Sequence, residues 1–364
     1  SSSHLVIFSQ DKPDYSLPMK FGSTFSDHMF EVDWTREAGW GTPTVSPYHD
    51  LALNPAATSL QYSLQCFEGM KAYIDPENRA RLFRPQLNMQ RFNRSMARLA
   101  MPTFDESQML ECIKQFVSVE KAWIPNIDGY SLYLRPTGIS THPFLGVGPT
   151  DFAKVYCIAS PVGPYYPEGF SAVSLLADTE NVRAWPGGTG ASKVGGNYAP
   201  GILPQIDAMG KGYSQVLWLF GADHTITEVG TMNMFVLLKQ PDGEVELVTP
   251  PLDDGTILPG VTRQSILDLA RAWGEVRVSE RAMTMAEFTE AANEGRVVES
   301  FGAGTAAIVA PIKRVGYAGV DYDIPLDPSQ PAEQAGPFTR RLYNAITDIQ
   351  YGRVEYEDWS VVID

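Results

Sequence analysis

One glycine-rich stretch, residues 187–200, constrains this chain more than any other segment. It holds a single lysine, Lys193, between two glycine clusters, and apolar or aromatic residues lie close by in sequence: Trp185, Val194 and Tyr198. Glycine loses much conformational freedom on folding and has no side chain to pack, so the clusters indicate a sharp turn or room for a bulky group. A mobile surface loop is the ordinary setting for a lysine, but a solvated linker does not need these neighbours. The pattern therefore predicts an amine held against a flat cofactor.

The chemistry of an amine supports this interpretation, and two nucleotide-binding motifs do not fit. Lysine attacks a carbonyl only when it is neutral, yet its ordinary pKa is roughly 10.4. Burial lowers that pKa, and storage of the amine as an imine removes the difficulty. Residues 188–193 begin like a dinucleotide fingerprint but end in lysine, and a P-loop needs Ser or Thr after its lysine, where this chain has Val194. A nucleotide-binding enzyme is therefore disfavoured.

Length and composition limit the class of protein. A chain of 364 residues suggests two domains, and 44% hydrophobic residues can build a substantial core. The net charge of −15 argues against nucleic acid and against an anionic membrane surface as partners. No apolar run is long enough to span a membrane. Cys66, Cys112 and Cys157 show no metal-binding spacing, so we expect core residues, no metal site and a reducing compartment.

Periodicity predicts a mixture of helices and strands. Apolar residues at helical spacing predict helices over 87–101, 263–273 and 338–351, and two capping boxes, Thr103 with Glu106 and Thr284 with Glu287, predict further helix starts. Short apolar runs predict strands at 131–135, 155–159, 216–220, 234–238 and 245–248.

Clusters of proline and glycine predict where the chain divides into domains. Residues 161–169 are rich in both and are the best candidate for an interdomain connection. We expect a small N-terminal α/β domain over 1–164, a loop over 165–173 and a large C-terminal domain over 174–364 that carries Lys193. Residues 1–60 look irregular, and His28 is interpreted as a structural, hydrogen-bonding histidine.

Four further stretches carry candidate binding residues. Glu228 lies beside Gly230 just before an apolar strand, and Arg91 lies on the first predicted helix. Pro259 and Gly260 make a turn before a helix, so the first helical N–H groups form a possible anion site, although every helix has such an end. Residues 301–307 combine small side chains with a hydroxyl, which suits close approach to a ligand. Taken singly, each has an ordinary explanation: a solvated charge, a surface arginine, a helix start or a turn.

Together these stretches resemble the branched-chain amino acid aminotransferases, fold-type IV enzymes that depend on pyridoxal 5'-phosphate. The similar runs are Ser-Lys-Val-Gly-Gly-Asn-Tyr around Lys193, Glu-Val-Gly-Thr-Met-Asn at 228–233, Leu-Pro-Gly-Val-Thr-Arg at 258–263 and Gly-Thr-Ala at 304–306. The resemblance covers nearly the whole chain and is closest to the animal-type enzymes. It implies an α+β fold of two mixed α/β domains with the cofactor between them, in a homodimer of the cytoplasm or mitochondrion.

The resemblance also implies an activity and a set of cofactor-binding residues. The enzyme would move the amino group of leucine, isoleucine or valine to 2-oxoglutarate, giving branched-chain 2-oxo acids and glutamate. Lys193 would hold the cofactor as an imine and move the substrate proton, while Glu228 would bind the pyridine nitrogen and keep it protonated. Tyr198 would bond the phenolic oxygen, and Arg91 would clamp the phosphate. The implied cofactor set is Arg91, Lys193, Tyr198, Glu228, Thr231, Val261, Thr262 and Thr305.

A substrate pocket follows from the same resemblance. Arg135 would reach the distal carboxylate of glutamate, so one site would serve two substrates. Leu145 and Val147 would enter from a neighbouring subunit, together with Tyr62. Where animal enzymes often carry Cys-x-x-Cys, this chain has Ala307 and Ala310, so a thiol switch is not available there. The implied pocket comprises Phe21, Tyr62, Tyr133, Arg135, Leu145, Val147, Tyr165, Thr231, Ala306 and Ala307.

Other functions stay open at this point. A different fold-type IV activity, such as D-amino acid transamination or aminodeoxychorismate lyase chemistry, would share Lys193 and Glu228 but need another pocket. A binding module could keep the fold and lack turnover, although intact Tyr198 and Arg91 count against it. The sequence leaves open which of leucine, isoleucine and valine is preferred.

Overall fold

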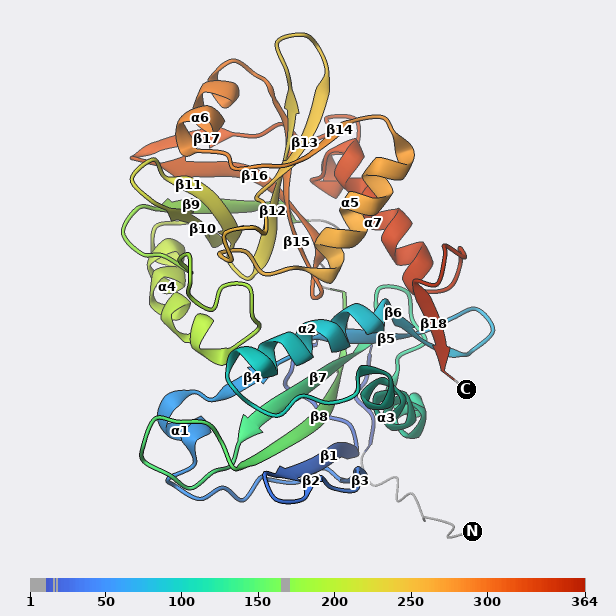
Figure 1. Ribbon diagram of the computed structural model, residues 1–364. Helices are drawn as coiled ribbons and strands as arrows, with labels where there is room; N and C mark the ends of the chain where they lie inside the picture. Colours follow the sequence, from blue (N-terminus) through green and yellow to red (C-terminus); the bar gives the residue numbers. More distant parts are fainter. Residues whose placement is uncertain (1–10, 16, 18, 165–170, 364) are drawn as a thin grey trace. The chain divides into compact units, whose positions relative to one another are not determined.

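The computed structural model describes residues 11–15, 17, 19–164 and 171–363 as two compact units (Figure 1). The first unit takes in Ser1–Pro167, Lys193–Gly195 and Asp348–Asp364, and the second takes in Glu168–Ser192 and Gly196–Thr347. Each contains one large sheet with helices packed against it.

The sheet of the first unit has nine strands. Seven follow the order β18-β6-β5-β7-β8-β1-β2, while β3 pairs with β1 and β4 pairs with β7. Its strands are β1 (His28–Thr35), β2 (Gly39–Trp40), β3 (Thr44–Pro47), β4 (Gln65–Phe67), β5 (Met70–Ile74), β6 (Ala80–Phe83), β7 (Ser131–Ser140), β8 (Phe152–Val162) and β18 (Ser360–Ile363). Its helices are α1 (Thr58–Tyr62), α2 (Pro85–Arg98) and α3 (Glu106–Val119).

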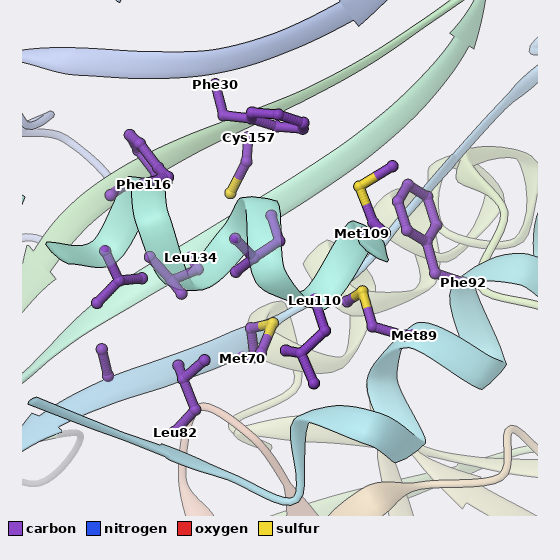
Figure 2. Packing of buried hydrophobic residues seen from close by; sticks show 14 of the residues in the cluster. Phe30, Met70, Leu82, Met89, Phe92, Met109, Leu110, Phe116, Leu134 and Cys157 are labelled. Atoms are coloured by element: carbon purple, nitrogen blue, oxygen red, sulfur yellow. The ribbon is translucent and has the colours of Figure 1, made fainter. Parts of the chain in front are cut away.

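The core of this unit lies between one face of the sheet and helices α2 and α3. Met89 and Phe92 of α2 and Phe116 of α3 are fully buried there against Leu134 of β7 and Cys157 of β8 (Figure 2). Each such side chain contributes roughly 1.5–3 kcal/mol of hydrophobic stabilisation. Because side chains alternate along a strand, the residues between the core positions of β7 and β8 lie on the opposite face of the sheet.

The two predicted capping boxes had different outcomes. Thr284 caps α6 as predicted, since its hydroxyl accepts from Glu287 N at 3.2 Å. The prediction that Thr103 caps the start of the helix that follows it, α3, was wrong. Asp105 is the N-cap of α3, and its carboxylate accepts from Gln108 N at 2.9 Å. Asp and Thr are both good N-caps, and the aspartate lies directly before the first helical residue.

The prediction that residues 1–60 are irregular was also partly wrong. Strand β1 lies there and pairs with β8 on one side and with β2 and β3 on the other. The structural interpretation of His28 is confirmed, because its Nδ1 lies 2.6 Å from the buried Glu120 Oε1.

The second unit contains another nine-stranded sheet, in which six strands close into a ring. The main order is β11-β10-β9-β16-β15-β12-β13-β14, β17 pairs with β16, and an additional β11–β12 pairing closes the ring. Its strands are β9 (Val173–Asp178), β10 (Gln215–Phe220), β11 (Thr225–Val229), β12 (Met232–Lys239), β13 (Val245–Thr249), β14 (Arg277–Glu280), β15 (Val297–Gly304), β16 (Ile308–Tyr317) and β17 (Val320–Asp323). The remaining helices are α4 (Ile202–Gly210), α5 (Val261–Trp273), α6 (Met285–Asn293) and α7 (Pro337–Gln350).

The division of the chain differs from the one expected over 1–164, 165–173 and 174–364. Strand β18 pairs with β6 and therefore extends the first sheet, and Val194 forms a bridge to Cys66 of β4. Both segments return to a sheet formed much earlier in the chain. Such long-range pairing depends on two distant edges matching, which no local pattern reveals. Residues 165–170 of the expected loop lie outside the described residues.

Two general features of the described chain bear on function. Over residues 11–15, 17, 19–164 and 171–363, no helix is long and apolar enough to cross a membrane. In the same part of the chain, no group of three or more His, Cys, Asp or Glu side chains is placed to hold a metal ion.

Candidate active site

Lys193 is fixed at its backbone on both sides in the first unit. Its N–H donates to Ser95 Oγ of α2 at 2.8 Å, and its carbonyl accepts from Phe67 N at 3.0 Å. The amine Nζ lies 5.0 Å from the centroid of the Phe67 ring, and the next residue, Val194, is buried in the core of the unit. Lys193 is therefore held in place beside an aromatic ring, unlike a lysine in a solvated linker.

The glycine-rich loop before Lys193 is tied together by one amide side chain in the second unit. Asn197 Nδ2 donates to the carbonyls of Thr189 at 2.8 Å and Ser192 at 2.9 Å. Its Oδ1 accepts from Thr189 Oγ1 at 2.6 Å. These three bonds tie Thr189 and Ser192 to the segment that follows Lys193.

Arg91 of α2 is held by a buried carboxylate that the sequence analysis did not single out. Arg91 Nε and Nη2 each lie 2.8 Å from Glu68, on Oε1 and Oε2 respectively, and both side chains are almost fully buried. Asn88 Nδ2 adds a bond of 2.8 Å to Glu68 Oε2. A bidentate pair fixes the plane of the guanidinium.

Glu228 of β11 is a buried carboxylate with several donors in the second unit. Only 1% of it is exposed. Its Oε1 accepts from Leu258 N at 2.7 Å and from Asn233 Nδ2 at 3.2 Å, while Arg183 Nε lies 2.7 Å from Oε2. The arginine compensates the buried charge, and the N–H donors fix its orientation. Sequence reasoning found Glu228 but missed Arg183, which lies far from it along the chain.

Helix α5 begins at the turn expected for an anion site. Gly260 is its N-cap and makes no side-chain cap, so the first-turn N–H groups of Val261 and Thr262 meet no capping side chain from that residue. A Cβ at position 260 would lie 2.1 Å from Asn233 Oδ1. Only glycine allows this approach, which brings the helix start next to the asparagine that also binds Glu228. The positive end of a helix favours a bound anion.

Two predicted residues, Tyr198 and Thr231, meet at one cavity of about 230 Å³ in the second unit. Arg183 and Trp218 also line it. Thr231 lies in the turn between β11 and β12. Thr305, Ala306 and Ala307 form the turn between β15 and β16, outside the lining of this cavity.

A second cavity, of about 310 Å³, brings together three predicted substrate residues in the first unit: Phe21, Tyr133 and Arg135. The Phe21 and Tyr133 rings meet edge to face, with centroids 5.0 Å apart. Arg135 Nη2 donates to Tyr133 Oη at 3.1 Å. The Arg135 guanidinium carbon also lies 4.7 Å from the Phe67 ring centroid, so Phe67 contacts both this arginine and Lys193. Sequence reasoning missed Phe67, because one aromatic residue in a short strand carries no distinguishing signal.

The residues expected to come from a neighbouring subunit lie elsewhere in the first unit. Leu145 is 67% exposed and Val147 is 82% exposed. Tyr62 is also exposed, and its hydroxyl donates to the Leu145 carbonyl. These three do not line the cavity around Arg135. Tyr165 lies outside the described residues.

Comparison with known proteins decides the family. The model of the amino-transferase class IV family matches residues 65–315. The branched-chain-amino-acid aminotransferase of Dictyostelium discoideum is 55% identical over 344 residues, which cover 94% of this chain and 89% of that protein. The chain belongs to the class IV aminotransferases, among the branched-chain-amino-acid aminotransferases. The family resemblance read from the motifs is thereby confirmed.

Two further comparisons extend this result. The mitochondrial branched-chain-amino-acid aminotransferase of Bos taurus is 51% identical over 353 residues, covering 97% of this chain and 88% of that protein. The branched-chain amino acid aminotransferase of Thermobaculum terrenum, solved in its PLP-form, has a TM-score of 0.71 at 20% identity and covers 92% of this chain and 98% of that chain. The predicted α+β, fold-type IV architecture of this class IV aminotransferase is therefore confirmed.

Proposed function

We propose that this chain is a pyridoxal 5'-phosphate-dependent aminotransferase that moves the amino group of leucine, isoleucine or valine to 2-oxoglutarate. The products are the branched-chain 2-oxo acids and L-glutamate. Relatives at 55% and 51% identity carry the name of this activity. The structural observation that supports it most directly is Lys193, bonded at its backbone by Ser95 and Phe67 with its amine beside an aromatic ring.

The side chains present fit pyridoxal 5'-phosphate by their chemistry. The buried Glu228 suits a protonated ring nitrogen, the uncapped start of α5 and Arg91 suit a phosphate, and the Lys193 amine suits an aldehyde. When bound, this cofactor supplies a carbonyl that combines with amines and a ring that accepts electrons.

Each residue of this set has a defined task in the proposal. Lys193 removes and returns the proton at the substrate Cα, as a general acid and base. Glu228 keeps the proton on the ring nitrogen, and Arg183 and Asn233 hold its carboxylate in place. Tyr198 donates to the phenolic oxygen. Arg91 would bind the phosphate, as would the N–H groups of Val261 and Thr262 and the hydroxyls of Thr231 and Thr305.

Two kinds of substrate side chain are accommodated in this proposal. Phe21 and Tyr133 offer ring surfaces to a branched aliphatic chain, with Ala306 and Ala307 as small residues that leave it room. Arg135 binds the distal carboxylate of glutamate and 2-oxoglutarate. Tyr165 completes the set taken from the family.

The function is tested by the spectral change of the bound cofactor in single half-reactions. We expect L-leucine to shift the absorbance of the wild type, D-alanine to leave it unchanged, and Lys193→Ala to abolish the shift. Lys114→Ala is the matched control, because Lys114 pairs with the exposed Glu111 in α3. A response to D-alanine alone would favour another fold-type IV activity. A protein that stays colourless with added cofactor would favour a binding module, and unchanged turnover in Lys193→Ala would reject the assignment.

A homodimer is the second part of the proposal. Two apolar surfaces support it, the first formed by Leu60, Tyr62, Phe144, Leu145 and Val147, and the second by Ile202, Leu203, Ile206 and Met209 of α4. Each member is at least 39% exposed, and clustered exposed apolar side chains are typical of protein contacts. In the proposal a second copy covers them, and its Tyr62, Leu145 and Val147 complete the substrate pocket.

Sedimentation velocity tests the dimer. Leu145→Asp together with Ile206→Asp should give monomers with strongly reduced turnover, while Val320→Asp, at a 52% exposed position of β17, should stay dimeric. A wild type that sediments as a fully active monomer would refute the dimer. We also propose that the protein works in the cytoplasm or mitochondrion, and the bovine relative is named as mitochondrial.

A further inference from the structure

Ser160 of β8 lies on the face of the first sheet that carries Tyr133 and Arg135. In the register of β7 and β8, Tyr133 pairs with Ser160 and Arg135 pairs with Ile158. Directly paired residues point to the same face of a sheet, with Cβ atoms about 4.5–5.5 Å apart. Ser160 is therefore the immediate neighbour of Tyr133, on the face opposite to the core formed with α2 and α3.

Two polar atoms on this face are buried without a hydrogen bond. Ser160 is only 4% exposed, and neither its Oγ nor Arg135 Nε has a hydrogen-bond partner among the described residues. Buried polar groups nearly always have a partner. Both residues line the cavity of about 310 Å³, together with Phe21, Phe25 and the Tyr133 ring. A hydroxyl and a guanidinium N–H in one cavity make a pair of donors for a ligand oxygen.

Contacts around Arg135 fix where its donors can go. Its Nη2 is used by Tyr133 Oη at 3.1 Å, and its planar group lies over the Phe67 ring. The Tyr133 hydroxyl is itself confined, because a Cβ at Gly69 would lie 2.1 Å from it. Arg135 is thus held by neighbours that do not use its Nε, and the residue lines the cavity. A carboxylate is the ligand that matches a guanidinium edge plus a hydroxyl donor.

We propose that Ser160 is a specificity-determining residue, whose hydroxyl binds the distal carboxylate of glutamate and 2-oxoglutarate together with Arg135 Nε. This inference rests on the proposed function, in which Arg135 already has that ligand, and it adds the second donor. Branched-chain substrates have no polar group at that end, so they use the Phe21 and Tyr133 rings of the same cavity instead. Ser160 therefore contributes to one half-reaction and not to the other.

Half-reaction kinetics of Ser160→Ala give the first test. We expect kcat/KM for L-glutamate to fall about tenfold, the size expected for one hydrogen bond to a charged group, while kcat/KM for L-leucine stays unchanged. Ser160→Thr keeps a hydroxyl and should retain at least half of the glutamate activity. Ser131→Ala is the matched control, because Ser131 is a buried serine of the adjacent β7 that does not line the cavity. An equal loss with both substrates would mean a structural role and would overturn the proposal.

Equilibrium binding gives a second test that does not depend on turnover. Calorimetric titration with glutarate, a dicarboxylate without a reacting group, should show a Kd about tenfold higher for Ser160→Ala, and 4-methylpentanoate should bind both proteins equally. If the wild type binds both acids but transaminates neither substrate, the proposed function fails while Ser160 keeps its ligand. If Ser160→Ala binds glutarate as tightly as the wild type, Ser160 has no part in the site.

Discussion

Arg183 Nε lies 2.7 Å from Glu228 Oε2, and both side chains are almost completely buried. The same arginine donates to the Thr256 carbonyl at 2.9 Å. The ion pair therefore connects the strand that carries Glu228 to the loop before α5. A buried pair of this kind stabilises little in itself, but removal of one partner leaves an uncompensated charge.

Removal of Arg183 should destabilise the fold. We expect Arg183→Met to lower the free energy of unfolding by about 3–5 kcal/mol, because the buried Glu228 then loses the guanidinium that lies 2.7 Å from its carboxylate. The double variant Arg183→Met with Glu228→Gln should lose less than the sum of the two single changes, since it leaves no bare charge. Urea unfolding followed by circular dichroism measures this. Arg341→Ala breaks an exposed pair with Glu275 and a contact with the Trp273 ring, and should cost about 1–2 kcal/mol. Equal midpoints for Arg183→Met and the wild type would contradict the prediction.

The Glu68–Arg91 pair should control cofactor affinity. Glu68→Gln keeps the size of the side chain but removes the charge that fixes the Arg91 guanidinium. We expect the Kd for pyridoxal 5'-phosphate to rise about tenfold, the order of one charge-assisted hydrogen bond. Equilibrium dialysis measures it, with Glu111→Gln on the exposed side of α3 as the control. An unchanged Kd would show that Arg91 is held without Glu68.

The start of α7 should depend on a side chain from β15. Glu299 is 4% exposed and accepts from Phe338 N at 2.9 Å, from Thr339 N at 2.8 Å and from Thr339 Oγ1 at 2.7 Å. A carboxylate at a helix N-terminus satisfies donors that have no intrahelical partner. Glu299→Ala should therefore cost about 2–3 kcal/mol, measured by urea unfolding. Glu294→Ala, at an exposed position before the same strand, should cost less than about 0.5 kcal/mol. If Glu299→Ala and Glu294→Ala lowered the free energy of unfolding by similar amounts, the capping role of Glu299 would be refuted.

Stability at acid pH should depend on Glu246. Burial alone raises the pKa of its carboxyl, but hydrogen bonds from Arg281 and Ser279 and the charges of Arg281 and Arg277 lower that pKa from 4.5 to about 2. As the pH falls, the Glu246 carboxyl is therefore protonated in the unfolded chain before it is protonated in the folded protein. The stabilising contribution is fully present above about pH 4.5 and is lost as the pH falls towards 2.

Unfolding free energies between about pH 2 and 6 test this prediction. Glu246→Gln should lower stability near the upper end of this range and flatten the loss between pH 4.5 and 2, compared with the wild type. Glu290→Gln, at an exposed position of α6, should leave the slope as it is. A variant curve that runs parallel to the wild-type curve would rule out Glu246 as the source.

Local residue patterns predicted most of the helices and strands whose formation depends on residues close together in sequence. The predicted helix 263–273 agrees with α5, and the strand predicted at 245–248 agrees with β13. Thr284 was correctly found as a cap, whereas Asp105 replaced Thr103 because two good caps lay within one turn of each other. The pairing of β18 with β6 was missed, since a short C-terminal strand looks the same whichever sheet it joins.

Some residues of the candidate site could likewise be predicted from local patterns, and others could not. Lys193 and Glu228 could be found from sequence because glycine-rich loops surround them, and glycine near a reactive side chain is a local signal. Arg183, Glu68 and Ser160 could not. Their importance comes from an atom of a distant segment that lies within bonding distance or in the same cavity, and an isolated arginine, glutamate or serine has no pattern that shows this.

The sequence by itself determined the family, the α+β class and the presence of a lysine in a glycine-rich loop, a glutamate before a strand and a helix that begins after a Pro-Gly turn. These features depend on residue type and short-range spacing, which are present in the sequence whatever the tertiary structure is. Only the tertiary structure decided that Glu68 holds Arg91, that Arg183 holds Glu228 and that Ser160 shares a cavity with Arg135. Those relationships exist because strand register and helix packing bring remote side chains within a few ångströms, and in a buried, poorly solvated place that proximity sets both charge and specificity.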